Sequence, residues 1–201
     1  MVTVTLLGSA QDGGVPQVGC NCCTDLQQRY PVSIGLTDAE GGNHLFEATR
    51  YLGEQLRIWG VDSVDSLFLT HAHFGHVDGL GLFGKETMNA QGVSLHCSKS
   101  MLDLIERTPN WSILLSHGVF SPRTASLVQL PGVTVEALKV PHRAELSDMH
   151  AYLIKAEKTL LFHPDHDTWQ ETLREHDLRA WLNHLEVDIA LIDGTFFSSD
   201  E

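Results

Sequence analysis

Three histidines stand close together in the stretch 70–80, which reads THAHFGHVDGL and follows a short apolar segment. That segment, Ser66–Thr70, is typical of a buried strand. Because side chains alternate along a strand, His71 and His73 are expected to point to the same side, where two imidazoles can bind one cation at about 2.0–2.1 Å. His76 follows after a turn and can reach a neighbouring position. The stretch therefore predicts a metal site rather than a solvated histidine-rich loop.

Two further potential ligands follow later strands. His142 comes after the expected strand Val133–Val140, and Asp165 comes after the expected strand Thr159–His163. Residues that follow strands can converge at one edge of a sheet although they are distant in sequence. Taken alone, His142 could be an ordinary surface histidine. Asp165 could instead stabilise the N-terminus of a following helix through its negative charge.

The rest of the chain has no internal repeat, low-complexity tract or linker, so we expect one domain over residues 1–201. Strands come first and helices are interspersed later, which predicts an α/β fold, an αββα sandwich of two mixed sheets with outer helices. The expected strands are Val2–Leu7, Pro31–Thr37, His44–Ala48, Ser66–Thr70, Val93–Cys97, Val133–Val140, Tyr152–Ala156, Thr159–His163 and Val187–Ile192. The expected helices are Thr49–Trp59, Gly79–Asn89, Ser98–Arg107 and one that begins with a capping box at Thr168 and Glu171. Residues 109–131 are ambiguous.

The charge of the chain limits the classes of partner that it can bind. Twenty-six Asp and Glu oppose 13 Lys and Arg, a formal net charge of −13, and no basic cluster interrupts it. Such a surface repels nucleic acid. No segment approaches the roughly 18–20 apolar residues of a membrane span, and the N-terminus lacks the basic segment of a signal peptide. We expect a cytoplasmic protein that acts on a small molecule, with no nucleic-acid or membrane partner and an oligomeric state left open.

Three of the four cysteines lie together at Cys20, Cys22 and Cys23. In a chain without a secretory signal, clustered cysteines indicate metal or redox chemistry more readily than a disulfide framework. One expectation is a zinc ion held by Cys20 and Cys22 together with Cys23 or Asp25. The other is a thiol-rich loop without metal.

The chain resembles the metallo-β-lactamase superfamily over essentially its whole length. Residues 70–80 are similar to the signature His-x-His-x-Asp-His, and Val140-Pro141-His142 is similar to the second motif, a single histidine after a strand. Residues 161–165 are similar to the third motif, in which an aspartate bridges two metals. The opening residues 7–17 and the closing residues 192–196 are closer to the branch that contains the pyrroloquinoline-quinone biosynthesis protein B.

The sequence departs from this pattern in two places. Gly75 stands where the signature has an aspartate, and glycine has no side chain that can bind a metal. The family also supplies a last histidine after its final strand, and this chain ends at Glu201 without one, so we expect a shortened or degenerate member.

The resemblance implies one strongly held zinc ion and a weak second position, with iron or manganese as other metals that histidine-rich sites accept. The first position would be formed by His71, His73 and His142. The second would have only His76 and Asp165, unless Asp193, His163 or His166 contributes.

Three functions remain open. The favoured one is a metal-dependent hydrolase that uses metal-activated water on an ester, amide or phosphoester of a small molecule, with Asp165 and His76 as catalytic residues that orient the water or a second metal. Arg143, Glu145 or His150 would then contact the substrate. The second, implied by the resemblance, is a protein of quinone-cofactor biosynthesis that handles or oxidises a peptide-derived precursor. The third is a metal-binding relative without catalytic activity.

Overall fold

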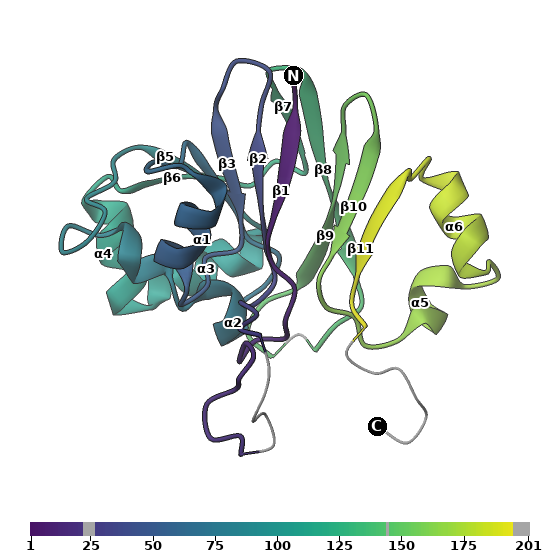
Figure 1. Cartoon of the computed structure of the whole chain (residues 1–201), viewed down its shortest axis with the longest axis horizontal. Coiled ribbons are helices and arrows are strands. Elements are labelled where there is room, and N and C mark those ends of the chain that lie inside the picture. The colour runs from purple at the N-terminus through teal and green to yellow at the C-terminus, as the bar shows by residue number, and fades with distance from the viewer. Residues whose placement is uncertain (22–26, 144, 195–201) are drawn as a thin grey trace.

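Two β-sheets face each other, and helices cover their outer sides, in a computed structural model that describes residues 1–21, 27–143 and 145–194 (Figure 1). Within these residues the first sheet has six strands in the order β1-β2-β3-β4-β5-β6, and the second has five in the order β11-β10-β9-β8-β7. Both sheets are mixed, since β3 to β6 run parallel in the first and β10 and β11 run parallel in the second. The arrangement confirms the predicted αββα sandwich.

The first sheet contains β1 (Thr3–Gly8), β2 (Ser33–Thr37), β3 (Asn43–Phe46), β4 (Ser66–Phe68), β5 (Val93–His96) and β6 (Phe120–Arg123). The second contains β7 (Leu127–Leu130), β8 (Val133–Val140), β9 (Met149–Lys155), β10 (Thr159–His163) and β11 (Ile189–Ile192). The helices are α1 (Leu52–Trp59), α2 (Phe74–Val77), the 3-10 helix η1 (Leu80–Phe83), α3 (Lys99–Arg107), α4 (Pro109–Ser116), α5 (Trp169–Leu173) and α6 (Leu178–His184). None of the helices in the described residues has the length and apolar character needed to cross a membrane.

Aromatic side chains join the two sheets. Phe46 of β3 stacks on Phe68 of β4 with ring centroids 4.6 Å apart, and its ring meets Tyr152 of β9 and Phe162 of β10 edge-on at 5.4 and 5.9 Å. All four side chains are buried. Aromatic rings contribute much of the apolar area that a core removes from water. This cluster therefore holds the inner faces of the two sheets together.

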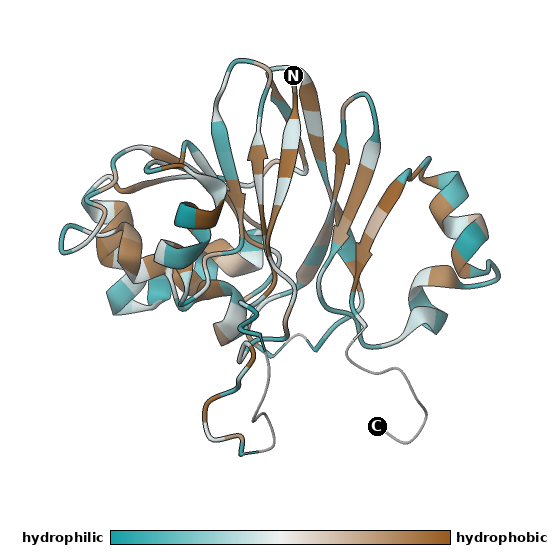
Figure 2. Cartoon of the chain, viewed as in Figure 1, coloured by the Kyte–Doolittle hydropathy of each residue, from teal (hydrophilic) through white to brown (hydrophobic). Residues whose placement is uncertain are grey.

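The outer faces of the sheets bury apolar side chains against the helices. Leu45, which precedes Phe46 and therefore points to the opposite face, packs with Leu52 and Leu56 of α1. On the second sheet, Leu161 packs against Trp181 of α6. The strands are accordingly apolar along much of their length, whereas the helices alternate polar and apolar faces (Figure 2).

The structure corrects two of the predicted helices. The helix expected over 79–89 is reduced to η1, because Gly79 and Gly84 flank a short apolar run. A Cβ on Gly79 would lie 2.8 Å from the carbonyl oxygen of Ala48, so the chain packs there too closely for a regular helix of larger residues. The ambiguous residues form α4, β6 and β7.

The predicted capping box at Thr168 is also wrong. The Thr168 side chain makes no capping hydrogen bond, and α5 ends after five residues. A second helix, α6, begins instead after Asp177, whose carboxylate accepts a hydrogen bond of 2.7 Å from the N–H of Ala180. Trp181, Leu182 and Leu185, which pack against the core of the second sheet, belong to this second helix and the residue that follows it.

The strand directions place four loops at one edge of the sandwich. β1 runs in the same direction as β3 and β4, and β8 runs in the same direction as β10. Their carboxyl ends lie at the lower edge in Figure 1, together with α2. The candidate metal ligands come from the segments that follow β1, β4, β8 and β10, and His76 lies in α2 within the segment after β4.

Candidate metal centre

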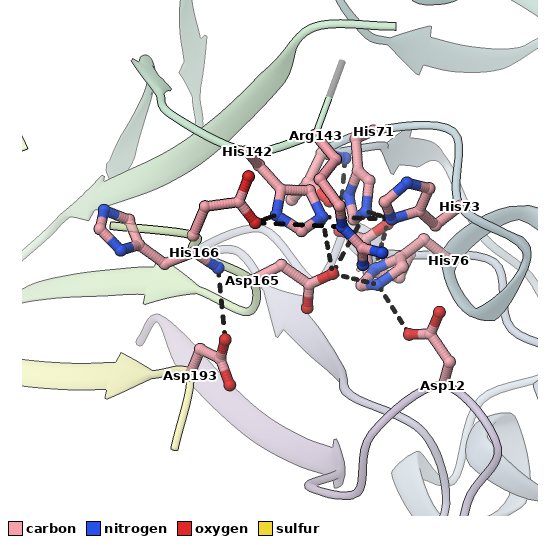
Figure 3. A network of polar contacts seen from close by, with 12 residues as sticks. Asp12, His71, His73, His76, His142, Arg143, Asp165, His166 and Asp193 are labelled. Carbon is pink, nitrogen blue, oxygen red and sulfur yellow. Dashed lines mark hydrogen bonds and ion pairs between the residues drawn. The ribbon is translucent and has the colours of Figure 1, made fainter. Parts of the chain in front are cut away.

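Three histidine rings and one carboxylate converge at this edge (Figure 3). Nδ1 of His73 lies 2.9 Å from Nε2 of His71 and 3.1 Å from Nε2 of His142. Oδ2 of Asp165 lies 3.2 Å from Nε2 of His71 and 3.5 Å from Nε2 of His142. The four ligand atoms therefore surround a common point, although the chain separates them by up to 94 positions between 71 and 165.

These separations fit a bound transition metal. A tetrahedral zinc ion with bonds of about 2.0–2.1 Å holds its ligand atoms about 3.3 Å from one another. The four distances above lie between 2.9 and 3.5 Å. Neutral imidazoles and an ionised carboxylate are also the donor set that zinc, iron and manganese accept.

The outer nitrogens of these rings have partners of their own. Nδ1 of His71 lies 2.9 Å from the hydroxyl of Thr70, and Nδ1 of His142 lies 2.8 Å from Oδ1 of Asp167. Carboxylate or hydroxyl partners of this kind fix the tautomer and the direction of a metal-binding imidazole. Nε2 of His71 and Nε2 of His142 are thereby aimed at the common point.

A second group of ligand atoms adjoins the first. Nε2 of His76 lies 3.3 Å from the same Oδ2 atom of Asp165 and 3.2 Å from Oδ1 of Asp12. The Asp165 oxygen thus faces both groups, the arrangement that a bridging ligand requires. The sequence predicted only His76 and Asp165 at this second position, and the structure adds a carboxylate from the loop after β1.

Glu47 lies behind His76 and is fully buried. Its Oε2 atom is 3.5 Å from Nδ1 of His76, and its Oε1 atom accepts a hydrogen bond of 3.3 Å from the N–H of Thr70. The backbone of Glu47 has a φ of 71°, a region that costs a residue with a side chain about 1–2 kcal/mol. Such strain persists where surrounding contacts hold it, which is typical of functional sites.

At the first position, the electrostatics of His71 and Asp165 favour metal-binding protonation states. Burial lowers the pKa of His71 to about 4, so its ring is neutral. Burial alone would raise the pKa of Asp165, but its bonds to His71 and His76 hold that pKa well below its usual range. Deprotonated histidine and carboxylate are the forms that coordinate a metal.

A cleft of about 990 Å³ opens beside these residues, between the ends of β1 and β11. Its size is within the range of small-molecule sites. Asp12, His142 and Asp165 lie on its wall, and Arg143 supplies a cation there. Apolar lining comes from Leu6, Val32, Ala190, Leu191 and Ile192.

The structure brings together five of the seven predicted metal ligands: His71, His73, His76, His142 and Asp165. The two histidines of the first pair follow β4 in a loop rather than lying on the strand itself, so strand alternation is not what aligns them. Cys20 is disulfide-bonded, a state without the thiolate that binds zinc. Cys22 lies outside the described residues, and zinc binding by this loop stays a prediction for the reduced chain.

The three further residues considered for the second position, His163, His166 and Asp193, belong to neither group of ligand atoms. His163 is fully buried beside Trp169 with ring centroids 5.4 Å apart, and burial lowers its pKa to about 3. Nε2 of His166 lies 2.8 Å from the Thr172 hydroxyl, and Asp193 accepts a hydrogen bond from the N–H of His166.

Of the residues expected to contact substrate, Arg143 lines the cleft, and Oε2 of Glu145 lies 3.3 Å from Nε2 of His73. His150 of β9 lines a different, smaller cavity together with Phe68 and Cys97.

Three residues of this centre were missed by the sequence analysis. Asp12 lies in a long loop, and no other potential ligand stands near it in the sequence at a spacing typical of a metal site. Asp167 follows Asp165 and had no predicted partner. Glu47 could have been found from the sequence. It is a single carboxylate directly after the apolar strand β3, and a buried carboxylate requires a polar or charged partner.

Sequence comparisons place the chain among known proteins. The Beta-lactamase superfamily domain matches residues 36–201. The chain is 24% identical to a coenzyme PQQ synthesis protein B of Cupriavidus necator, in an alignment that covers 100% of this chain and 75% of that protein. A shorter match is 42% identical over 82 residues to an octanoyltransferase of Porphyromonas gingivalis and covers 37% of this chain but only 16% of that much longer protein.

Solved structures show the same fold. The Zn²⁺-bound PqqB of Methylobacterium extorquens superposes with a TM-score of 0.75 at 20% identity, covering 100% of this chain and 75% of that one. A diphosphatase of the PhnP family superposes with a TM-score of 0.67 at 20% identity, covering 94% of this chain and 87% of that one. The chain belongs to the beta-lactamase superfamily, and over its whole length it is similar to the PQQ synthesis protein B.

Proposed function

We propose that the chain is a metal-dependent hydrolase of an ester, amide or phosphoester in a small molecule. The observation that carries the proposal is the shared position of one oxygen, Oδ2 of Asp165, between the ring nitrogens of His71 and His142 on one side and His76 on the other. Hydrolase relatives of this fold, such as the diphosphatase of the PhnP family, support the same class of reaction.

His71, His73 and His142 would hold a divalent cation. When bound, that cation would polarise the substrate oxygen and would lower the pKa of its bound water to about 7. The residues of the chain contribute orientation and charge. The ionised carboxylate of Asp165 faces the cleft and can accept a hydrogen bond from a water molecule, which orients that water toward the substrate. The water oxygen forms a bond to the carbon or phosphorus, the bond to the leaving oxygen or nitrogen breaks, and the proton passes to the leaving group.

The cleft favours a substrate with both polar and apolar parts. The electrophilic group would lie at the wall formed by Asp12, His142 and Asp165, and an apolar part would contact Leu191 and Ile192 of β11. Arg143, with its side chain 65% exposed at the cleft, can attract an anionic substituent in an otherwise acidic chain.

The test combines metal content with activity. Protein purified without chelator is expected to carry zinc, iron or manganese and to hydrolyse members of a panel of thioesters, lactones, amides and phosphodiesters. His73→Ala removes the ligand atom nearest to both His71 and His142, so it should lose the first metal and at least about a hundredfold in kcat/KM, which equals roughly 2.7 kcal/mol of transition-state stabilisation. Exposed His117 provides the matched control, His117→Ala, which should change neither. Full activity in His73→Ala would refute the proposal.

A second candidate function is a step in the biosynthesis of a quinone cofactor. It is favoured by the alignment with coenzyme PQQ synthesis protein B, which covers the whole of this chain. Oxygen consumption that requires added Fe²⁺ and a peptide-derived aromatic precursor, in protein that is silent on the hydrolase panel, would favour this candidate. Substoichiometric metal with no activity in either assay would favour a metal-binding protein without catalysis.

A further inference from the structure

The volume beside Gly75 is filled by the side chain of Asp12. Gly75 lies buried in the first turn of α2, and a Cβ built on it would be 2.6 Å from Cβ of Asp12 and would overlap its carboxylate. Atoms this close cannot coexist, so residue 75 can have no side chain while Asp12 keeps its place. A carboxylate therefore lies next to His76 although the local sequence provides none.

Asp12 is held there by the backbone of its loop. The loop turns at Gly14, whose N–H donates to the carbonyl of Gln11 at 2.8 Å. On either side of the turn, the loop pairs with residues 29–32: Ala10 donates to Tyr30 at 3.0 Å, and Val15 and Arg29 exchange hydrogen bonds of 2.8 and 2.9 Å. These bonds fix the backbone of the loop. Figure 3 shows the Asp12 side chain reaching from this loop to His76.

His76 supplies an independent sign of a ligand. Its ring has no exposed surface, and among the described residues neither ring nitrogen makes a hydrogen bond of acceptable geometry. A buried nitrogen that makes no hydrogen bond is unfavourable unless another partner satisfies it. Nε2 of His76 is nevertheless aimed between Oδ1 of Asp12 at 3.2 Å and Oδ2 of Asp165 at 3.3 Å. One imidazole nitrogen between two carboxylate oxygens is a donor set for a divalent cation.

We propose that Asp12 is a ligand of a second metal position, together with His76 and Asp165, and that it replaces the carboxylate that Gly75 cannot supply. The inference rests on the proposed metal-dependent function and deepens it, because it makes the site a two-metal centre with Asp165 between the cations. Because Asp165 is shared between the two positions, Asp12 is the carboxylate that belongs to the second position alone. The loop 8–15 thereby becomes part of the metal site, and the second position is complete rather than weak.

An exchange of side chains tests the proposal. Native mass spectrometry of zinc-loaded wild-type protein should count about two zinc ions per chain, whereas Asp12→Ala should keep one. The double variant Asp12→Gly with Gly75→Asp should regain the second ion, because the new carboxylate grows into the space that Asp12 vacates. Gly75→Asp alone should lose the second ion, since two side chains then compete for one volume. Asp62→Ala removes an exposed carboxylate away from the centre and should keep both ions.

Asp12→Asn gives a second measurement that does not depend on the truncation. It preserves the volume and removes the charge, so competition with a chromophoric chelator should show at least about tenfold weaker binding of the second ion. Circular dichroism of the metal-free proteins checks that the variants fold.

The outcomes separate this inference from the proposed function. Wild-type protein that binds one ion, or Asp12→Ala that binds two with affinities unchanged from wild type, overturns the role of Asp12 and leaves the hydrolase proposal standing. Wild-type protein that binds no metal overturns both. An ion pair between Asp12 and a protonated His76 would be revealed by a variant that loses thermal stability without any change in the number of zinc ions, and that result also overturns the inference.

Discussion

The Asp12 side chain and the Gly75 backbone occupy complementary positions: a Cβ on Gly75 would lie 2.6 Å from Cβ of Asp12. Asp12 belongs to the loop after β1, and Gly75 belongs to α2, the short helix after β4. The complementarity explains why an interrupted metal-binding signature can still surround His76 with carboxylates.

Asp167 orients a ligand of the first position. Its Oδ1 atom lies 2.8 Å from Nδ1 of His142 and fixes the ring so that Nε2 faces the ligand atoms of His73 and Asp165. Asp167→Asn should weaken binding of the first zinc ion about 10–100-fold, the usual effect of losing such a partner. Chelator competition measures this change, with exposed Asp62→Asn as the control. An affinity within twofold of wild type would contradict the orienting role.

Glu47 has the corresponding role at the second position. Its buried carboxylate lies 3.5 Å from Nδ1 of His76, so Glu47→Gln keeps the volume but removes the charge that favours a proton on Nδ1. The second zinc ion should bind about 10–100-fold more weakly, and the first should be unaffected. Glu106→Gln, on an exposed part of α3, should change neither affinity. Equal weakening of both ions would indicate a general disturbance of the fold instead.

His96 makes stability depend on pH away from the metal centre. Burial lowers its pKa to about 4, with Arg123 and His44 as nearby charged or titratable groups, whereas the unfolded value is 6.5. The unfolded chain therefore takes up the proton first as the pH falls, and folding stability is lost between about pH 6.5 and 4. The loss from pH 7 to pH 5 should be about 2 kcal/mol.

His96→Phe isolates this contribution. The ring of His96 stacks on Phe68 with centroids 4.3 Å apart, and phenylalanine can keep that stacking without a titrating nitrogen. Urea unfolding of metal-free protein at pH 7 and pH 5 should show a smaller drop in the free energy of unfolding for the variant than for wild type. The same drop in both proteins would contradict a neutral His96.

Phe46 tests the core between the sheets. Its ring contacts three other aromatic rings from both sheets, and its side chain is fully buried. Phe46→Ala should lower the free energy of unfolding by about 3–5 kcal/mol. Phe74, which is 67% exposed, gives the matched control, and Phe74→Ala should change stability by less than about 0.5 kcal/mol. Similar losses for both variants would contradict the assigned core.

The fold and most of the centre could be predicted because their signals are local. Strands such as β8 and β10 show apolar runs bounded by turn residues, and the histidines and Asp165 directly follow strand ends. The strand order then brings those ends to one edge. The helix expected over 79–89 failed because the apolar period there was given more weight than three glycines, which favour turns over helix.

Asp12 could not be predicted because its contact with α2 is long-range. It depends on backbone hydrogen bonds between the loop 8–15 and residues 29–32, and nothing in the spacing of Asp12 marks it as a ligand. Likewise, the absence of a side chain at Gly75 indicated a missing ligand, whereas in three dimensions it provides the space for one from another segment.

Anomalous diffraction from a zinc-soaked crystal, recorded on both sides of the zinc absorption edge, tests the central claim most directly. The account predicts one peak within bonding distance of His71, His73 and His142, at about 2.0–2.2 Å from their ligand atoms, and another between Asp12, His76 and Asp165. Anomalous peaks confined to other parts of the molecule, with the three imidazoles bonded only to one another and to water, would contradict it.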